Sequence, residues 1–176
     1  MSTGQTIITI AAFVFLTTIL LNFYGLVAST GEDISSGQDG ILETTIATSY
    51  MELAQGLSFD AVTDSSDIAI LNPTALTPAL NLGHDGAAED SIQNFDDFDD
   101  FNGLTVDKQP GGTDRKYRTR FTVYYTDPTN VSLLTTTRTF VKRMDLKTWR
   151  ISPAAGPSER LDTLRTSLVM GYFHFD

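Results

Sequence analysis

The chain has 176 residues, no cysteine and a net charge of −10 at pH 7. Without cysteine the protein cannot form disulfides, and thiolate chemistry is excluded. An acidic chain whose Lys and Arg residues are scattered rather than clustered is also not expected to bind nucleic acid.

Charge is distributed unevenly along the chain. Residues 1–107 contain 16 acidic residues and no Lys or Arg, whereas residues 108–176 contain all 12 basic residues and 6 acidic ones. Halves of opposite sign favour self-association, in which the acidic part of one copy contacts the basic part of a neighbour. Pairing of the two halves within one subunit is the alternative.

An uncharged apolar stretch runs from Ile7 to Ala28. It is 22 residues long, and the first charged residue of the chain is Glu32. About 20 apolar residues are enough to cross a bilayer as a helix. A cleaved secretory signal would have a basic n-region and a shorter core. A single membrane anchor, which would usually have basic flanks, is an alternative reading of this stretch.

Small and polar residues interrupt the apolar stretch: Thr9, Thr17, Thr18, Asn22 and Gly25. Such residues favour contact between helices over exposure to lipid. We therefore expect a helix that packs among copies of itself.

The next segment, Ser29 to Gly40, contains three glycines. Each costs about 1 kcal/mol relative to alanine inside a helix, so we predict a hinge or a melted segment here, followed by a new helical segment with Asp39 as its N-cap. Apolar residues recur at helical spacing in that segment, at Leu42, Ile46, Tyr50, Leu53 and Leu57. We expect residues 1–57 to form a spine and residues 58–176 a globular head, on which the amphipathic half of the spine lies.

The region from Ser58 to Asp107 lacks periodicity and is rich in Pro, Gly, Asp and Asn, which predicts a long connecting loop. Within it, residues 94–103 read NFDDFDDFNG. The three Phe residues of this motif recur every third position. That spacing predicts a tight helical turn whose rings are buried while its carboxylates face outward.

Four aspartates of the motif, Asp96, Asp97, Asp99 and Asp100, repel one another unless something neutralises them. Calcium is a possible cofactor, because Ca²⁺ takes oxygen ligands, although the spacing is not that of an EF-hand. Lys and Arg from the basic half are a second possible neutraliser. A hydrogen-bonded turn capped by these aspartates is the reading we prefer.

The sequence offers no catalytic constellation. His84 and His174 lie far apart and have no partners at metal-ligand spacing. There is no P-loop, nucleophile elbow or dinucleotide-binding fingerprint. We expect no enzymatic activity and no small-molecule substrate.

Alternating polar and apolar residues predict four strands in the C-terminal part: Tyr117–Thr126, Leu134–Met144, Lys147–Ser152 and Leu164–Phe175. Residues 127–130, DPTN, supply the first turn. Sequential strands with short links predict an antiparallel sheet, and the apolar stripe of the spine is the candidate cover for its apolar face. The expected fold class is α+β: a long N-terminal helix packed on a C-terminal antiparallel sheet, with a long Asp-rich loop between them.

Several segments together carry a family resemblance: GQTIITIAAFVFL from Gly4, MELAQGLSFD from Met51, YRTRFTVYYTDP from Tyr117 and, most specifically, the Asp–Asp–x–Asp–Asp–aromatic–x–Gly pattern of Asp96 to Gly103. Their order resembles the type IV pilin and pseudopilin superfamily, and more closely the minor pilin-like proteins of the mannose-sensitive haemagglutinin type. The resemblance covers nearly the whole chain.

The resemblance implies a structural subunit that assembles through its N-terminal helix into a helical, pilus-like filament outside the cell, with the sheet domains outermost. The implied partners are copies of the same chain, the inner membrane before assembly, and the pilus assembly machinery. A minor pseudopilin, which is a membrane-anchored tip or priming subunit, is the alternative. A membrane-tethered, calcium-dependent adhesion domain is a third class.

The N-terminus departs from the family pattern. If a prepilin peptidase cut after Gly4, Gln5 would be the first mature residue and Thr9 the fifth, a place where the family usually has Glu. The usual basic residue before the glycine is also replaced, by Thr3. We expect Met1 to Gly4 to remain attached, and the helix core to assemble by apolar packing alone.

Overall fold

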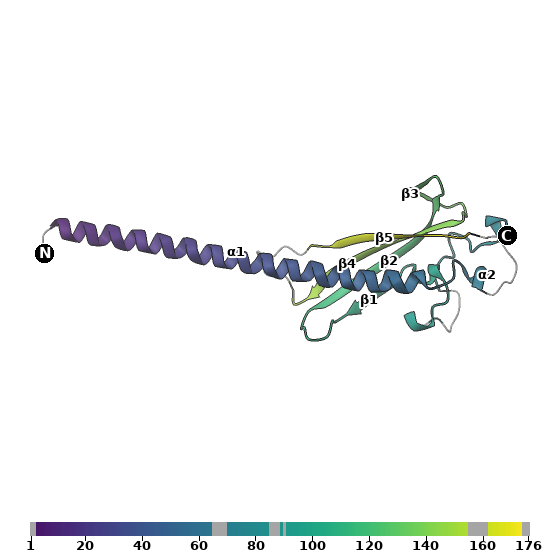
Figure 1. Ribbon diagram of the computed structural model, residues 1–176, viewed down its shortest axis with the longest axis horizontal. Helices are drawn as coiled ribbons and strands as arrows, with labels where there is room; N and C mark the ends of the chain where they lie inside the picture. Colours follow the sequence, from purple (N-terminus) through teal and green to yellow (C-terminus); the bar gives the residue numbers. More distant parts are fainter. Residues whose placement is uncertain (1–2, 65–69, 85–88, 90, 155–161, 174–176) are drawn as a thin grey trace. The chain divides into compact units, whose positions relative to one another are not determined.

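The computed structural model describes residues 3–64, 70–84, 89, 91–154 and 162–173 (Figure 1). The chain forms two compact units, Met1–Asp39 and Gly40–Asp176. Helix α1, Thr3–Gln55, begins in the first unit and ends in the second. The second unit also contains the sheet, and the fold class is α+β as predicted.

Helix α1 is unbroken for 53 residues, so the predicted hinge at residues 29–40 is wrong. Asp39 lies inside the helix and is not an N-cap. The physical reason is cooperativity: once a helix is nucleated, each further residue adds a hydrogen bond. Three glycines together cost only about 3 kcal/mol, which a long helix tolerates.

The last part of α1 covers one face of the sheet, as the apolar stripe predicted (Figure 1). Ile46, Ala47, Tyr50 and Ala54 are buried in a core shared with the strands. Leu53 departs from the prediction, since 42% of its surface is exposed. The two alanines take the buried positions instead, and their small side chains let the helix backbone approach the sheet.

The sheet has five antiparallel strands: β1 (Thr105–Lys108), β2 (Lys116–Asp127), β3 (Asn130–Thr135), β4 (Val141–Ser152) and β5 (Leu164–Gly171). The main path runs β1-β2-β4-β5, and β3 pairs with the end of β2. The first predicted strand, its turn and the start of the last strand are confirmed.

The predicted strands Leu134–Met144 and Lys147–Ser152 are wrong in their boundaries. Residues 130–135 form β3, a turn region follows, and residues 141–152 form the single strand β4. The buried face of β4 includes Lys142 and Arg150, and these charged residues obscure the alternation of polar and apolar positions. Strand β1 lies partly inside the region predicted as loop.

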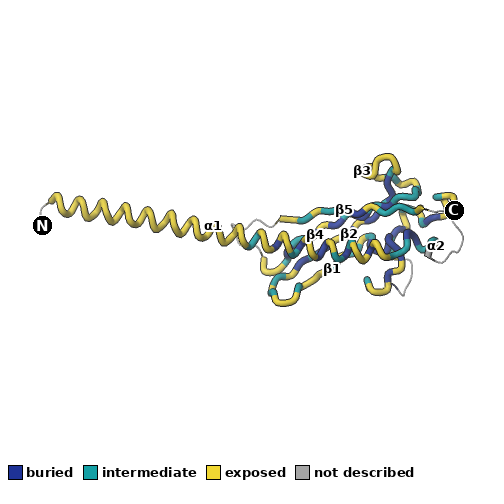
Figure 2. The backbone as a smooth tube through the Cα atoms, in the orientation of Figure 1, coloured by how far each residue is buried: buried dark blue, intermediate teal, exposed yellow. Residues whose placement is uncertain are grey.

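The described residues between α1 and β1 are mostly irregular, as predicted, and they include helix α2 (Ala61–Asp64) and the short 3₁₀ helices η1 (Pro73–Ala75), η2 (Ile92–Asn94) and η3 (Phe98–Phe101). Phe95, Phe98 and Phe101 are all buried. The centre of the Phe101 ring lies 5.3 Å from the centre of the Phe121 ring on β2. The Asp-rich motif is therefore built into the core of the second unit (Figure 2).

Candidate functional site

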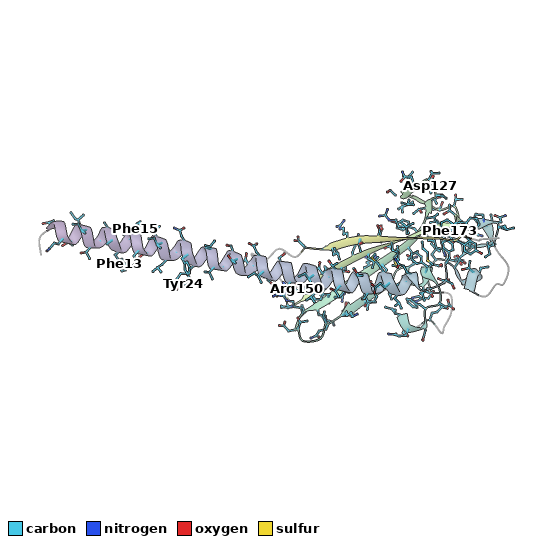
Figure 3. The ribbon with its side chains drawn as sticks, viewed as in Figure 1. Phe13, Phe15, Tyr24, Asp127, Arg150 and Phe173 are labelled. Carbon is cyan, nitrogen blue, oxygen red and sulfur yellow. The ribbon has the colours of Figure 1, made fainter. Side chains whose placement is uncertain are left out.

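The first candidate site is the surface of α1 within the first unit. Every described residue from Thr3 to Ile34 is exposed (Figure 2). The exposed side chains are large and apolar; for example, Phe13 is 71% and Leu21 is 67% exposed. Phe13, Phe15 and Tyr24 project outward from the helix in Figure 3. A helix that is apolar all round is normally buried in protein or lipid.

The polar side chains inside this apolar surface bind their own helix. The hydroxyl groups of Thr9, Thr17 and Thr18 each donate to the carbonyl oxygen four residues earlier, at 2.9 Å. The Nδ2 of Asn22 donates to the Thr18 carbonyl, also at 2.9 Å. Because these donors are satisfied within the helix, they need no water. The whole surface can therefore enter an apolar environment without losing these hydrogen bonds.

Helix α1 is also long and apolar enough to cross a membrane, by length and composition. The apolar window lies near the N-terminus and none of it is buried within the chain. This property favours insertion into a membrane or secretion.

The second candidate site is the Asp-rich motif, which folds around η3. The Asp97 carboxylate caps the helix: its Oδ1 accepts hydrogen bonds from the backbone N–H groups of Asp99 at 2.8 Å and Asp100 at 3.2 Å. In return, Oδ2 of Asp100 accepts from the N–H groups of Asp96 at 3.1 Å and Asp97 at 3.3 Å. This is a reciprocal capping box, in agreement with the preferred interpretation of the sequence.

Asp99 has a different role, because it faces the charged side chain of Lys142 on β4. The Lys142 Nζ also donates to Oδ2 of Asp60 at 2.8 Å and to the Phe59 carbonyl at 2.8 Å. The side chains of Lys142 and Asp60 are fully buried. One ammonium thus joins the loop after α1, the Asp-rich motif and the sheet. A basic residue from the C-terminal half neutralises part of the cluster, which was one of the predicted possibilities.

The four aspartates were expected to face outward, and this is wrong for three of them. Asp97, Asp99 and Asp100 are each only 2% exposed, whereas Asp96 is exposed. Burial is tolerated because backbone N–H groups and Lys142 supply the hydrogen bonds that water would otherwise make.

Burial sets the protonation of the cluster. It is the largest effect on Asp97 and Asp100, followed by repulsion from neighbouring carboxylates, and together they raise the pKa of each group to about 7. Burial also raises the pKa of Asp99, against the attraction of Lys142. For Asp60, burial is outweighed by Lys142 and by hydrogen bonds from Thr77, and its pKa is lowered. Of the two carboxylates that contact Lys142, Asp60 is the one whose pKa is lowered, because Lys142 and Thr77 favour its charged form.

The structure does not bring the four predicted calcium ligands together around one point. Carboxylate oxygens of Asp96 and Asp100 instead lie within 4.8 Å of each other and of one from Glu89, close enough to share a cation. Asp97 caps η3 and Asp99 contacts Lys142. Calcium binding remains a prediction, and calorimetric titration of the parent and of Asp96→Asn with CaCl₂ would test it. Sequence reasoning missed Glu89 because it precedes the motif.

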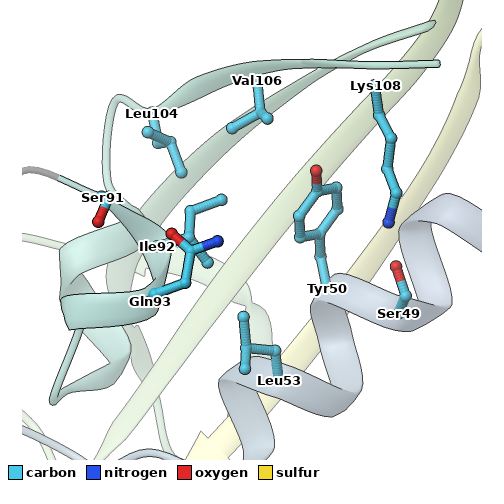
Figure 4. A pocket seen from close by; sticks show the side chains of 9 residues that line it. All are labelled: Ser49, Tyr50, Leu53, Ser91, Ile92, Gln93, Leu104, Val106 and Lys108. Carbon is cyan, nitrogen blue, oxygen red and sulfur yellow. The ribbon is translucent and has the colours of Figure 1, made fainter.

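A cavity of about 620 Å³ lies between the end of α1 and strand β1 (Figure 4). Tyr50, Leu53 and Ile92 supply apolar lining, together with Val106 of β1. The Nζ of Lys108 lies 5.4 Å from the centre of the Tyr50 ring, a cation–π distance. No local pattern indicates this cavity, since its residues come from three separate segments.

Comparison with protein-family models, with curated proteins and with solved structures gave no match. The chemistry of the two candidate sites and the architecture are therefore what bear on function. A long, apolar N-terminal helix whose last part packs on a C-terminal antiparallel sheet is a fold that resembles a pilin.

Proposed function

We propose that the chain is the structural subunit of an extracellular, type IV pilus-like helical filament that polymerises through its N-terminal hydrophobic helix. The observation that carries the proposal is the exposed surface of α1 from Ile7 to Ala28, which is apolar on all sides and carries no charged side chain. Burying one Leu, Ile or Phe side chain is worth about 1.5–3 kcal/mol. Such a surface is unfavourable in water and needs lipid or protein around it.

Two features favour protein as the final environment. The hydroxyl groups of Thr9, Thr17 and Thr18 are satisfied within the helix, so close packing against another helix leaves none of these three donors unpaired. The segment also lacks flanking Lys or Arg, the residues that hold simple anchors in a bilayer. Membrane insertion then serves as a stage before assembly, and copies of the chain replace lipid in the filament.

The second unit supplies a folded head. Its core holds the end of α1, the Asp-rich motif and the sheet together through buried contacts. A head with its own core can stay folded while the apolar helix changes its environment. We propose that the heads form the outer layer of the filament.

Electron microscopy of the purified full chain tests the proposal, with Leu21→Arg as the variant. A charge at this exposed, apolar helix position should abolish long filaments, because a buried unpaired charge is strongly unfavourable. Leu80→Arg is the matched control: Leu80 is 95% exposed in the second unit, and its variant should assemble like the parent.

Absence of long homopolymers in the parent would contradict the proposal. Single subunits held in membranes would favour the alternative, a minor pseudopilin at a tip or in a priming complex. Filaments formed by Leu21→Arg would also contradict the proposed role of the helix.

A further inference from the structure

The outer face of the sheet, opposite the face that α1 covers, carries a row of three positive charges. Arg120 of β2 is paired in register with Lys147 of β4, and Lys147 is paired with Arg165 of β5. All three are exposed. Side chains directly opposite on adjacent antiparallel strands lie about 5 Å apart at Cβ, and like charges there are destabilising. We name these three residues the cationic row.

The cationic row differs from the other positive charges on this face. The Nε of Arg118 lies 2.7 Å from Oδ1 of Asp107, and the Nε of Arg143 lies 2.8 Å from Oδ1 of Asp145. Within the residues that the structure describes, the side chains of the cationic row make no ion pair or hydrogen bond. Repulsion along the row is thus uncompensated by the described part of the subunit.

The row also borders a depression. A hollow of about 350 Å³ is lined by Lys147 and Arg165, together with Arg143, Asp145 and Ser167. The cations of Lys147 and Arg165 therefore lie beside the Ser167 hydroxyl, and the carboxylate of Asp145, which also lines the hollow, is bound by Arg143. This combination of donors suits carboxylates.

Among the described residues of the acidic half, the exposed acidic residues are Glu32, Asp33, Glu52, Asp96 and Asp107, and Asp107 is bound by Arg118. Asp39, Glu43, Asp60, Glu89 and three aspartates of the motif are buried. Among the described residues, Glu32 and Asp33 are exposed, consecutive acidic residues on α1. They follow directly on the apolar segment that the proposed function places among copies.

We infer that the cationic row is a docking surface for a second copy of this chain, and that the Glu32–Asp33 pair of that copy is its ligand. The inference rests on the proposed function, since the apolar helix is what would bring these carboxylates to a neighbouring subunit. Charge complementarity supports it. No described carboxylate forms an ion pair with the cationic row, and residues 1–107 contain acidic residues but no Lys or Arg. Such contacts fix the register of association more than its strength.

A charge-swap experiment on full-chain filaments tests the inference, with sedimentation measuring the concentration of unassembled protein. Lys147→Glu/Arg165→Glu should raise that concentration at least about fivefold at low salt, because two attractions become repulsions. Glu32→Lys/Asp33→Lys should do the same. Combining all four substitutions should restore the parent value to within about twofold.

Two controls separate local from general effects. Lys108→Glu/Lys116→Glu changes net charge equally but lies at the β1–β2 hairpin, and it should assemble like the parent. Thermal unfolding should show that the head of Lys147→Glu/Arg165→Glu remains folded. Should that variant fail to fold, Arg120→Gln/Lys147→Gln/Arg165→Gln replaces it, with the same expected direction.

The outcomes distinguish this inference from the function on which it rests. If the parent forms no filaments, the proposed function fails. If the parent forms filaments but the swaps do not change the unassembled concentration, or the combination does not restore it, the docking inference alone is wrong. The parent should also release subunits as NaCl rises from about 20 mM to about 500 mM, since salt screens these charges.

Discussion

Lys142 and Asp60 form an ion pair at 2.8 Å in which both side chains have no exposure to solvent. Asp60 follows α1, and Lys142 lies 82 positions later on β4. The pair is surrounded by aromatic groups: the Lys142 Nζ lies 4.6 Å from the centre of the Phe59 ring and 5.5 Å from that of Tyr125. Because these surroundings have low polarity, removing either partner would leave a buried charge unpaired and would destabilise the fold.

Replacing Lys142 by Met should destabilise the second unit by about 3–5 kcal/mol, because Asp60 and Asp99 would remain buried without their cation. Urea unfolding of the full chain, followed by the fluorescence of Trp149, measures this. Lys147→Met on the same strand is the control, since Lys147 is exposed, and it should change stability by less than about 0.5 kcal/mol. Asp60→Asn/Asp99→Asn added to Lys142→Met should recover part of the loss; no recovery would contradict the ion-pair explanation.

The raised pKa of Asp97 predicts that the stability of the folded state depends on pH. Its pKa is raised to about 7, chiefly by burial, so the folded state binds a proton more tightly than the unfolded state. The protonated Asp97 side chain therefore stabilises the folded state. This stabilisation is complete below the ordinary pKa of Asp and is lost as the pH rises through about 7. Asp97→Asn, whose amide oxygen can still cap η3, should therefore be more stable than the parent by about 2 kcal/mol at pH 8.

The same substitution should have little effect near pH 4, where Asp97 is already protonated. Thermal unfolding at both pH values checks the prediction, with exposed Asp114→Asn as the control. An equal change at pH 4 and pH 8 would show that the carboxyl does not titrate as inferred.

Asn102 connects two parts of the head. Its Oδ1 accepts a hydrogen bond from the Val123 N–H at 2.9 Å, and its Nδ2 donates to the Leu82 carbonyl at 2.9 Å. Asn102→Ala should cost about 1–3 kcal/mol in the free energy of unfolding, because both backbone groups lose a partner. Chemical unfolding measures the loss, and the same substitution at exposed Gln93 should cost much less. Equal losses at the two positions would contradict the bridging role.

Two glycines should respond oppositely to alanine. Gly103 follows η3 with φ of 78°, a conformation that disfavours other residues, so Gly103→Ala should destabilise the head by about 1 kcal/mol or more. Gly31 is helical, and a Cβ there would meet nothing within 4 Å. Gly31→Ala should stabilise α1 by about 1 kcal/mol. Circular dichroism of the full chain in detergent micelles would show higher helicity for Gly31→Ala; lower helicity would contradict an unbroken helix.

Periodic segments could be predicted from the sequence. Burial of one face of a helix or strand leaves a regular repeat of apolar residues, which is visible in a single amino-acid sequence. Strand β2 and the stripe around Ile46 and Tyr50 are examples. The burial of Lys142 on strand β4 could not be predicted, although Lys142 lies inside the predicted strand Leu134–Met144. Its burial depends on Asp99, which is 43 positions away, and no local pattern contains that partner.

The Asp-rich motif shows the same limit. The spacing of its Phe residues predicted a tight turn with buried rings, and η3 confirms this. The burial of Asp97 and Asp100 could not be foreseen, since it requires backbone N–H groups that point at the carboxylates only after the turn has folded. Residue type indicated repulsion between the aspartates, whereas tertiary structure determined how it is relieved.

The self-satisfied hydroxyl groups of α1 carry a mechanical consequence. A helix surface with neither charge nor outward hydrogen bonds adheres strongly but without direction, because dispersion and the hydrophobic effect depend little on angle. Rotation about the helix axis or a small axial slip would break no specific bond. A polymer built on such a core would extend by sliding of its helices, and its subunit spacing would have to be set by groups outside the core.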